Sequence, residues 1–503
     1  MPFLFLSGFL LLAAYPLIGS TAAVWVLVGS QLALLVGEIR KGQVSGVGGF
    51  IFMSFLFFGV RPIYLIWEND YKLFRQLFAI RVDLTEVGDA MWWASAATLC
   101  FALGAYAAPR ISRRWLQRRS RKAASDRGVA LPGVQLCYGM MFAQVATLPV
   151  MAWLASSGRG LYGSALGAYA YDLPVPLQSI HILAVVILFD RYLRSKSPEG
   201  LAMLGISGLM FLAFTWWMRD VSLFRGFYVA GVMIAGIAAL QRMKGRVGFA
   251  WLIIPIVFLQ PFFGYLGGDR TKTNDELAEE DIVTEVFGRE TLAEAYWNFY
   301  DSRGDMNIFD TFVAAKKAEP AFHPYVWSWA YVPLHLVPRA LWKSKPKRGV
   351  TMDLSFARGA PYAPGIAGFL LLDGGLLWML GSMAVLGFLI ATLDGWVFTL
   401  PRGYVQYCMV GIVTVNAMFL TRFFLWQYFY QMLYAMVPIM ALAWWFGRTS
   451  PPKRTMRAAW SVEHGAWGRE QSGVGCSLER EPWSETAPAV NAHEGRKGRL
   501  KSE

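Results

Sequence analysis

The sequence predicts an all-α polytopic membrane protein, and three properties of its composition lead to that fold class. The chain has 503 residues, of which 55% are hydrophobic, and its mean hydropathy is +0.38. Charged residues make up 16% of the chain, whereas soluble globular proteins carry about 25%. Aromatic residues reach 15%, which is typical of proteins whose amphipathic rings collect at the two membrane interfaces.

Apolar segments long enough to cross a bilayer recur along the chain. A hydrocarbon core about 30 Å thick needs roughly 20 apolar residues per helix, which here predicts about 12 transmembrane helices. Pro16 and the stretch Gly19-Ser20-Thr21 alone break the first two, so one long tilted helix or a helical hairpin fits residues 3–36 equally well. No Lys or Arg precedes the first segment, so we expect it to be retained as a span rather than cleaved as a signal peptide. The expected spans are residues 3–18, 20–36, 48–66, 89–107, 133–154, 177–193, 200–216, 227–241, 248–267, 374–397, 404–420 and 423–446.

The charge of the connecting segments predicts an orientation. Basic residues collect in every second connection, namely 37–47, 108–130, 191–199 and 242–247, and the connections between them are mixed in charge or nearly neutral. Cytoplasmic loops of membrane proteins carry an excess of Lys and Arg. We therefore expect both termini in the cytoplasm.

The chain is expected to divide into four parts. Residues 1–267 carry the first nine spans, 268–373 form one large outer loop, 374–446 carry the last three spans, and 447–503 form a disordered cytoplasmic tail. The loop opens acidic, continues with a helical-looking stretch at 290–318, and becomes aromatic and basic. Structureless connections beyond about 15 residues are uncommon unless they are functional or disordered. The many Trp and Tyr residues favour short helices on the outer membrane–water interface.

The sequence contains none of the motifs that are typical of common soluble enzymes. There is no P-loop, no G-x-G-x-x-G opening a helix after a strand, and no H-E-x-x-H. The four cysteines are isolated, without metal spacing or a disulfide framework, so no metal or other cofactor is expected. The net charge of +13 comes largely from topology-setting loops, which argues against nucleic acid as a partner. Because no ATP-binding motif is present, we expect the protein either to move a solute down a gradient or to act on a substrate that arrives already activated.

Basic side chains on the predicted outer face are the most informative functional feature. Arginine at that face opposes the usual topological bias, and guanidinium groups bind phosphate in a bidentate manner and remain charged. Snorkelling to lipid headgroups is the simpler explanation for any single arginine, but for the set we favour a pyrophosphate at the outer leaflet. The set comprises Arg219, Arg225, Arg303, Arg339, Lys345, Lys347, Arg348, Arg358 and Arg422.

Two further polar residues lie near this set. His335 stands four residues before Arg339, which on a helix puts both on one face. A neutral imidazole beside a guanidinium can act as general base for a sugar hydroxyl, and an interfacial histidine bonded to backbone is an equally good interpretation. Asp373 precedes Gly374 and Gly375, which indicate that a span begins just after it. We interpret Asp373 as an outer-edge residue, compatible with a re-entrant segment from residue 363, rather than as an intramembrane proton relay.

The stretch from His335 to Pro346, HLVPRALWKSKP, resembles the Pro-Arg-x-x-Trp-x-x-Lys-Pro signature of bacterial oligosaccharide repeat-unit polymerases, the O-antigen or exopolysaccharide (Wzy-like) polymerases. The following GIAGFLLLDGGLLWMLGSMAVLG is similar to the segment where that family's chain re-enters the membrane. The Arg-Gly pair at 225–226 is similar to an arginine of an earlier periplasmic loop of the family. Many spans and a large, late periplasmic loop extend the likeness over most of the chain, although those features are unspecific. Lys343 stands where family members often have Pro after the tryptophan.

The resemblance implies a membrane-embedded, metal-independent glycosyltransferase of the bacterial inner membrane. Such enzymes use an undecaprenyl-pyrophosphate-linked oligosaccharide as donor and transfer the growing glycan onto an incoming lipid-linked repeat unit. A separate chain-length regulator protein is an implied partner. The family-equivalent positions are Arg225, Arg339, Trp342 and Lys345. Charge and location add His335, Arg219, Arg422, Arg358 and Arg303, with Arg339, His335 and Arg225 expected to be catalytic and the others to bind pyrophosphate or glycan.

Two other functions share parts of this pattern. An O-antigen-ligase-like enzyme has the same layout and donor with a different acceptor, and the Pro-Arg-x-x-Trp-x-x-Lys-Pro run favours the polymerase over it. A transporter or lipid-linked-oligosaccharide flippase would show internal repeats and buried midplane charges, whereas no clear repeat is seen here. A dolichol-type glycosyltransferase with metal-binding acids in its first outer loop is excluded, because the turn around 17–21 contains no acid.

Overall fold

The computed structural model describes most of the predicted helical regions and parts of the connections. It describes residues 10, 13–14, 20–67, 72–73, 80–125, 133–157, 174–221, 226–244, 248, 251–253, 308–317, 327–335, 342, 365–400, 403–422 and 425–449. The chain divides into two compact units, Met1–Ala443 and Trp444–Glu503. The contacts described below belong to the first unit.

The described residues are almost entirely helical, as the sequence predicted. The exception is a short antiparallel pair in which Lys72 lies opposite Arg81 and Leu73 opposite Ile80. The elements are α2 (Ser20–Arg40), α3 (Gly46–Phe55), the π-helical turn η1 (Leu56–Val60), α4 (Arg61–Trp67), β1 (Lys72–Leu73), β2 (Ile80–Arg81), α5 (Leu84–Ser125), α6 (Val134–Ser157), α8 (Pro174–Ser195), α9 (Pro198–Val221), α10 (Gly226–Lys244), α15 (Ile308–Lys317), α16 (Trp327–His335), α17 (Gly365–Thr399), α18 (Tyr404–Leu420) and α19 (Leu425–Thr449).

Six helical segments among the described residues are long and apolar enough to cross a membrane. Two shorter apolar helices, Val229–Met243 and Tyr404–Leu420, accompany them. A helical, membrane-associated protein is therefore the fold class, and the larger number of spans remains a prediction. The six segments are Gly46–Trp67, Leu84–Ile111, Val134–Leu154, Pro174–Ser195, Pro198–Trp217 and Gly365–Thr399.

Some helix boundaries agree with the predicted spans, and two helices, α5 and α17, extend well beyond them. Residues 404–420 were predicted and form α18. The predicted span 89–107 lies in α5, but that helix continues through Pro109 to Ser125, well into the predicted loop 108–130. Arg, Ala, Lys and Gln are good helix formers, so the basic connection prolongs the helix. The second difference is α17, which begins at Gly365, before the predicted start at residue 374.

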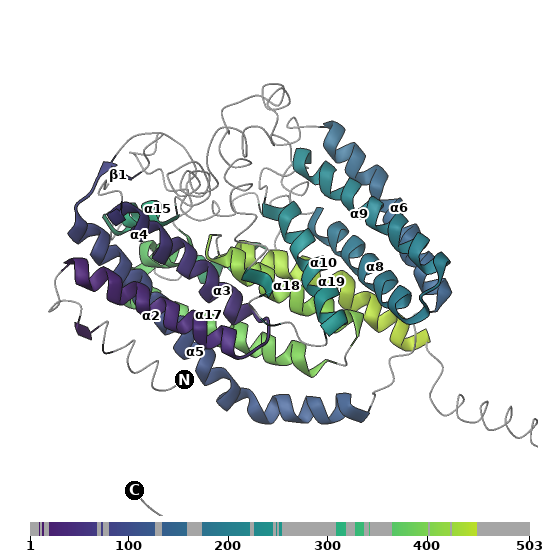
Figure 1. Cartoon of the computed structure of the whole chain (residues 1–503), viewed down its shortest axis with the longest axis horizontal. Coiled ribbons are helices and arrows are strands. Elements are labelled where there is room, and N and C mark those ends of the chain that lie inside the picture. The colour runs from purple at the N-terminus through teal and green to yellow at the C-terminus, as the bar shows by residue number, and fades with distance from the viewer. Residues whose placement is uncertain are drawn as a thin grey trace, which may run out of the picture. The chain divides into compact units, whose positions relative to one another are not determined.

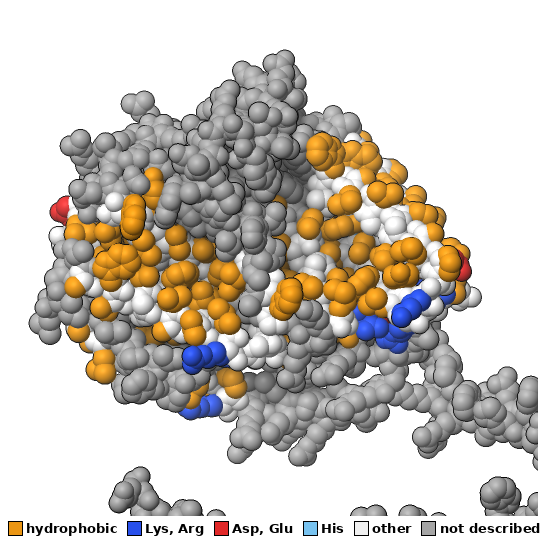
Figure 2. Space-filling model, viewed as in Figure 1, with side chains coloured by type: hydrophobic (Ala, Val, Ile, Leu, Met, Phe, Trp, Pro, Cys, Tyr) orange, Lys and Arg blue, Asp and Glu red, His pale blue; other side chains and the backbone are white. Residues whose placement is uncertain are grey.

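Neighbouring helices form a series across the first unit (Figure 1). Helices α2, α5 and α17 pack together at one end, α3 and α18 follow, and α10 joins α18 to α8. Helices α6 and α9 pack against α8 and against each other at the other end. On one face, hydrophobic side chains cover a broad band, and the described Lys and Arg gather mainly along its lower margin (Figure 2). Large apolar side chains such as Phe142 and Leu209, 75% and 68% exposed, belong to such a lipid-compatible surface.

Helices α5 and α17 approach each other closely. A Cβ added at Gly104 would overlap the carbonyl oxygen of Ala384, and one added at Gly387 would overlap that of Phe101. Glycines at membrane helix interfaces allow this close approach of two backbones. Helix α17 also carries a break at Gly374 and Gly375, where φ is −166° and 75°, respectively. The break divides α17 into a short first part and a longer second part.

Candidate functional site

The structure describes only some of the residues that were predicted to form the site. Arg422 lies in the turn after α18, and Trp342 is partly buried. His335 is the last residue of α16, and Arg219 belongs to the last turn of α9. The remaining predicted residues, Arg225, Arg303, Arg339, Lys345 and Arg358, lie outside the described residues, as do Lys347 and Arg348.

The turn that carries Arg422 packs against the start of α17. The Arg422 N–H donates to the carbonyl oxygen of Phe419 over 3.0 Å, and the Thr421 hydroxyl donates to that of Met418 over 2.7 Å. Gly365 has φ of 67°, and a Cβ there would overlap the Thr421 carbonyl oxygen and lie 3.0 Å from Ile308 Cγ2. Only glycine suits this backbone conformation and this approach. The start of α15, the start of α17 and the Arg422 turn therefore meet.

Helix α16, from the predicted large loop, is joined to α17 and α19 by polar and aromatic contacts. The Ser328 N–H donates to Asp373 Oδ2 over 2.9 Å, and Trp329 Nε1 donates to Ser382 Oγ over 3.1 Å. The Trp329 ring lies 6.3 Å, centroid to centroid, from that of Phe429. These contacts fix the first turn of the helix that ends at His335. Asp373 is 5% exposed and directly precedes the break in α17, so its carboxylate is buried where the helix is interrupted.

Helix α15, also from the large loop, is held by a buried ion pair that the sequence analysis missed. Arg61 Nε and Nη2 donate to the two carboxylate oxygens of Asp310 over 3.2 and 3.0 Å, and both side chains are 0% exposed. Phe312 packs edge-on to Phe58 beside them, at 5.5 Å between ring centroids. Arg61 directly follows the π-helical turn η1, a distortion frequent at functional sites. The signal in the sequence that could have identified this site was the charged Arg61 inside the apolar run at 48–66.

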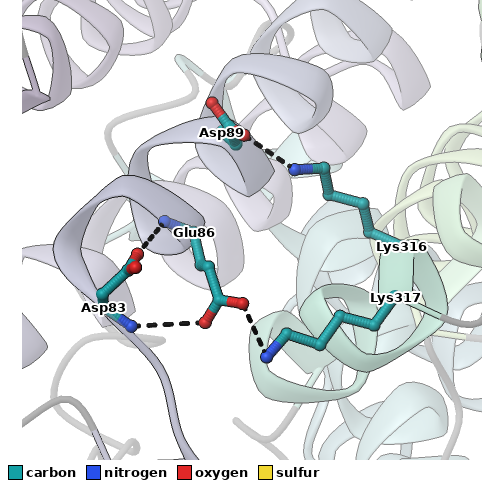
Figure 3. A network of polar contacts seen from close by, with 5 residues as sticks. All are labelled: Asp83, Glu86, Asp89, Lys316 and Lys317. Atoms are coloured by element: carbon teal, nitrogen blue, oxygen red, sulfur yellow. Dashed lines mark hydrogen bonds and ion pairs between the residues drawn. The ribbon is translucent and has the colours of Figure 1, made fainter.

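A second set of ion pairs joins the other end of α15 to the start of α5 (Figure 3). Lys316 Nζ lies 3.0 Å from Asp89 Oδ2, and Lys317 Nζ lies 2.7 Å from Glu86 Oε1. Glu86 and Asp83 each accept a hydrogen bond from the other's backbone N–H, over 3.2 and 2.7 Å. That reciprocal pairing is a capping box at the helix start. The side chains are partly exposed, so each pair contributes little on its own.

A polar cluster lies apart from the loop helices, between α6, α8 and α9. Gln144 Nε2 contacts His181 Nδ1 at 3.2 Å and donates to the Ser207 carbonyl oxygen, while the Ser207 hydroxyl donates to Gln144 Oε1 over 2.8 Å. Thr147 Oγ1 contacts His181 Nε2 at 2.7 Å. His181 is 0% exposed, and every member of the cluster has a partner. The cluster therefore acts as a structural link between three helices.

The contacts above join the described parts of the predicted large loop to the apolar helices. Both described helices of the large loop are fixed to the membrane helices, and α16 leads directly into the HLVPRALWKSKP run. No family model matches the chain, and neither the curated proteins nor the solved structures contain a detectably similar chain. The resemblance to repeat-unit polymerases thus depends on the sequence alone.

Proposed function

We propose that the protein polymerises lipid-linked oligosaccharide repeat units at the periplasmic face of a bacterial inner membrane. The observation that carries the proposal is the Pro-Arg-x-x-Trp-x-x-Lys-Pro run at 338–346, which begins just after α16. Helix α16 is bonded through Ser328 and Trp329 to α17. A reactive segment that must act at a membrane surface needs such an anchor, because catalytic groups must be held in place.

The proposed topology has twelve spans, both termini in the cytoplasm, and residues 268–373 in the periplasm. The spacing of basic connections supports it. The gathering of described Lys and Arg along one margin of the apolar surface (Figure 2) agrees with a single cytoplasmic side.

The proposed reaction exchanges a glycosyl–phosphate bond for a glycosidic bond. The hydroxyl oxygen of the incoming lipid-linked unit forms a bond to C1 of the donor glycan, and its proton passes to His335. The bond between C1 and the pyrophosphate oxygen breaks, and its electron pair leaves with undecaprenyl pyrophosphate. Arg339, Arg225 and Arg422 stabilise the negative charge on the departing group, as preorganised cations do in such transition states. Arg219, Arg303, Arg358, Trp342 and Lys345 are proposed to bind pyrophosphate or glycan.

Two alternatives make different predictions. A ligase-like transferase would use the same donor and attach finished polymer to another acceptor. A flippase or transporter is favoured by one feature, the break in α17 beside the buried Asp373, because interrupted helices with buried charges form midplane sites in transporters.

The test is the glycan profile of a deletion strain that carries either the wild-type chain or a variant of Arg339. We expect Arg339→Ala to abolish polymer while single lipid-linked units still reach the outer leaflet. Arg339→Lys should also be poor, because a bidentate phosphate contact needs the planar guanidinium.

The same profiles separate the alternatives. Units stranded on the inner leaflet of the deletion strain would indicate a flippase, and normal polymer left unattached would indicate a ligase. Unchanged polymer length and yield in Arg339→Ala would remove Arg339 from the proposed site.

A further inference from the structure

Helix α5 is about twice as long as a membrane span requires. It has 42 residues, which at 1.5 Å per residue corresponds to roughly 63 Å, against a hydrocarbon core about 30 Å thick. The segment Leu84–Ile111 is the part that is long and apolar enough to cross a membrane. Residues 112–125, which were predicted to be a loop, continue the same helix. The end of α5 therefore needs an explanation other than crossing the bilayer.

Interfacial side chains mark the place where α5 leaves the apolar layer. Arg110 Nη2 donates to the Tyr106 hydroxyl over 2.6 Å, and the guanidinium carbon lies 4.4 Å from the centre of the Tyr106 ring. Tyrosine and arginine are typical anchors at the membrane–water interface. Pro109 lies in the same turn, and prolines inside helices cause kinks. The ribbon of α5 changes direction in Figure 1, and its last part runs along the lower edge of the bundle, the margin where described Lys and Arg gather in Figure 2.

The last part of α5, residues 110–125, is strongly basic and contains no acid, and we call it the basic extension. Basic residues three and four positions apart are neighbours on a helix and repel one another. The helix propensity of the segment therefore acts against its own charge, and anions beside the helix would relieve the repulsion. The basic residues are Arg110, Arg113, Arg114, Arg118, Arg119, Arg121 and Lys122.

Basic residues near the other predicted cytoplasmic connections have carboxylate partners within the protein. Lys41 pairs with Glu38. Asp190 pairs with both Arg194 and Arg242. Two or three basic residues in a connection can thus set the topology and also join helices. The basic extension carries more positive charge than either task requires, and its own sequence supplies no carboxylate.

An anionic lipid surface supplies the missing negative charge. The predicted tail does not, because residues 447–503 contain more Lys and Arg than Glu and no Asp. Clusters of about four to eight basic residues on the cytoplasmic side of a membrane helix are attracted to anionic phospholipids. Trp115 and Leu116 stand in the middle of the basic run. Apolar residues among basic ones favour a membrane surface over a polyanion in solution.

We infer that the basic extension of α5 binds anionic phospholipid headgroups of the cytoplasmic leaflet. The inference uses the proposed orientation and is independent of the proposed polymerase reaction. Lipid phosphates neutralise the repulsion along the helix, and the extension then lies on the membrane surface. Because α5 packs closely against α17 at Gly104 and Gly387, the bound extension also fixes the depth of this helix pair in the membrane.

The test uses the purified full chain in lipid nanodiscs, which leave both membrane faces accessible. The discs consist of either phosphatidylcholine or phosphatidylglycerol. A nitroxide on Gln117→Cys, in a chain whose native cysteines are replaced by alanine, reports the access of a water-soluble relaxation agent to the extension. We expect the nitroxide to be shielded in phosphatidylglycerol and accessible in phosphatidylcholine. About 1 M salt should release it, because the screening length then falls to about 3 Å.

A charge-neutral variant and a matched control identify the basic residues as the cause. Glutamine removes the charge and is a good helix former. The extension variant, which should be accessible in both lipids, carries Arg113→Gln, Arg114→Gln, Arg118→Gln and Arg119→Gln. The tail variant, which should behave as the wild type, carries Lys453→Gln, Arg454→Gln, Arg457→Gln and Arg469→Gln. Size-exclusion profiles and thermal midpoints confirm folding, and the comparison of the two lipids stays decisive in the wild type if a variant fails to fold.

Equal access to the wild-type nitroxide in the two lipids would overturn the inference. Access in both would mean that the extension is solvated, and shielding in both would mean that it packs against protein or apolar lipid. Shielding that appears in phosphatidylcholine only when RNA is added would assign the extension to nucleic acid. Shielding of the extension variant in phosphatidylglycerol would show that charge is not the cause. None of these readouts involves polymer formation, so they are separate from the test of the proposed function.

Discussion

At the scale of single residues, two buried carboxylates, Asp310 and Asp190, bind arginines of distant elements. Arg61 and Asp310 make a bidentate contact in which both side chains are fully buried. Asp190 in α8 likewise binds Arg194 of its own helix and Arg242 of α10. A buried ion pair adds little net stability compared with apolar residues, but removing one partner leaves an uncompensated charge. Such pairs therefore determine which elements must meet.

The first prediction follows from the Arg61–Asp310 pair. Arg61→Met should lower the free energy of unfolding by roughly 3–5 kcal/mol, because it removes the bidentate cation from the fully buried Asp310 carboxylate. The double variant Arg61→Met with Asp310→Leu should be closer to the wild type than either single variant. Thermal unfolding of the purified protein in detergent measures all four chains. Additive losses in the double variant would show that the two side chains are not coupled.

At the scale of elements, α17 organises its neighbours. Its second part packs against α5 through Gly104 and Gly387. Its two buried carboxylates, Asp394 and Asp373, hold the starts of α3 and α16. The seam to α5 depends on small residues, since lipid offers no hydrophobic driving force between membrane helices.

The contact between α5 and α17 gives a prediction, and a second glycine on α17 provides the control. Gly387→Ala should destabilise the protein by about 1–3 kcal/mol, because the added Cβ would overlap the Phe101 carbonyl oxygen and force the helices apart. Gly381→Ala should be neutral or slightly stabilising, since no atom lies within 4 Å of a Cβ there. Thermal midpoints of both variants in detergent provide the measurement. Equal midpoints would mean that α5 and α17 are not closely packed in the membrane.

At the scale of the whole molecule, the proposed orientation puts the two ends of one span on opposite sides of the membrane, and chemical labelling can distinguish them. The segment Gly46–Trp67 is long and apolar enough to cross a membrane. Lys41 lies before it with its side chain 49% exposed, and Trp67 ends it at 75% exposure.

The corresponding prediction concerns reaction with a membrane-impermeant maleimide. In intact spheroplasts, Trp67→Cys should be labelled, and Lys41→Cys should be labelled only after lysis, because the positive-inside rule places Lys41 in the cytoplasm. The unsubstituted chain gives the background before and after lysis, because Cys476 lies in the predicted cytoplasmic tail, whereas Cys100, Cys137 and Cys408 lie within helices. The reverse labelling pattern would invert the topology and place the large loop in the cytoplasm.

Local sequence patterns predicted where the helices lie better than they predicted which residues contact one another. The apolar segment predicted at 404–420 coincides with α18, which is shorter than the six segments long enough to cross a membrane. The basic stretch after residue 107 was treated as a loop, since hydropathy does not register helix propensity in charged sequence. The break at Gly374 and Gly375 was recognised as a boundary, but the buried helical residues from Gly365 onward were assigned to the loop.

The candidate site was predictable only in part. Motif and charge pointed to the run after His335, and the contact between Ser328 and Asp373 shows how its helix is anchored. The pairing of Arg61 with Asp310 joins residues 249 positions apart, and no local pattern states which distant carboxylate an arginine will meet. His181 was overlooked because its partners, Gln144, Thr147 and Ser207, are neutral residues scattered through three apolar helices.

The Arg61–Asp310 pair also has a consequence for biosynthesis. Chain elongation adds about 5–20 residues per second, so the 249 positions between the two residues correspond to roughly 12–50 s of translation. In the proposed orientation, the span with Arg61 enters the bilayer during that time, while its carboxylate partner has not yet been made. The cation then waits near the lipid headgroups or beside an earlier helix, and it reaches its final depth after the loop has been translocated. The proposed topology thus ties maturation of this early span to export of a late segment.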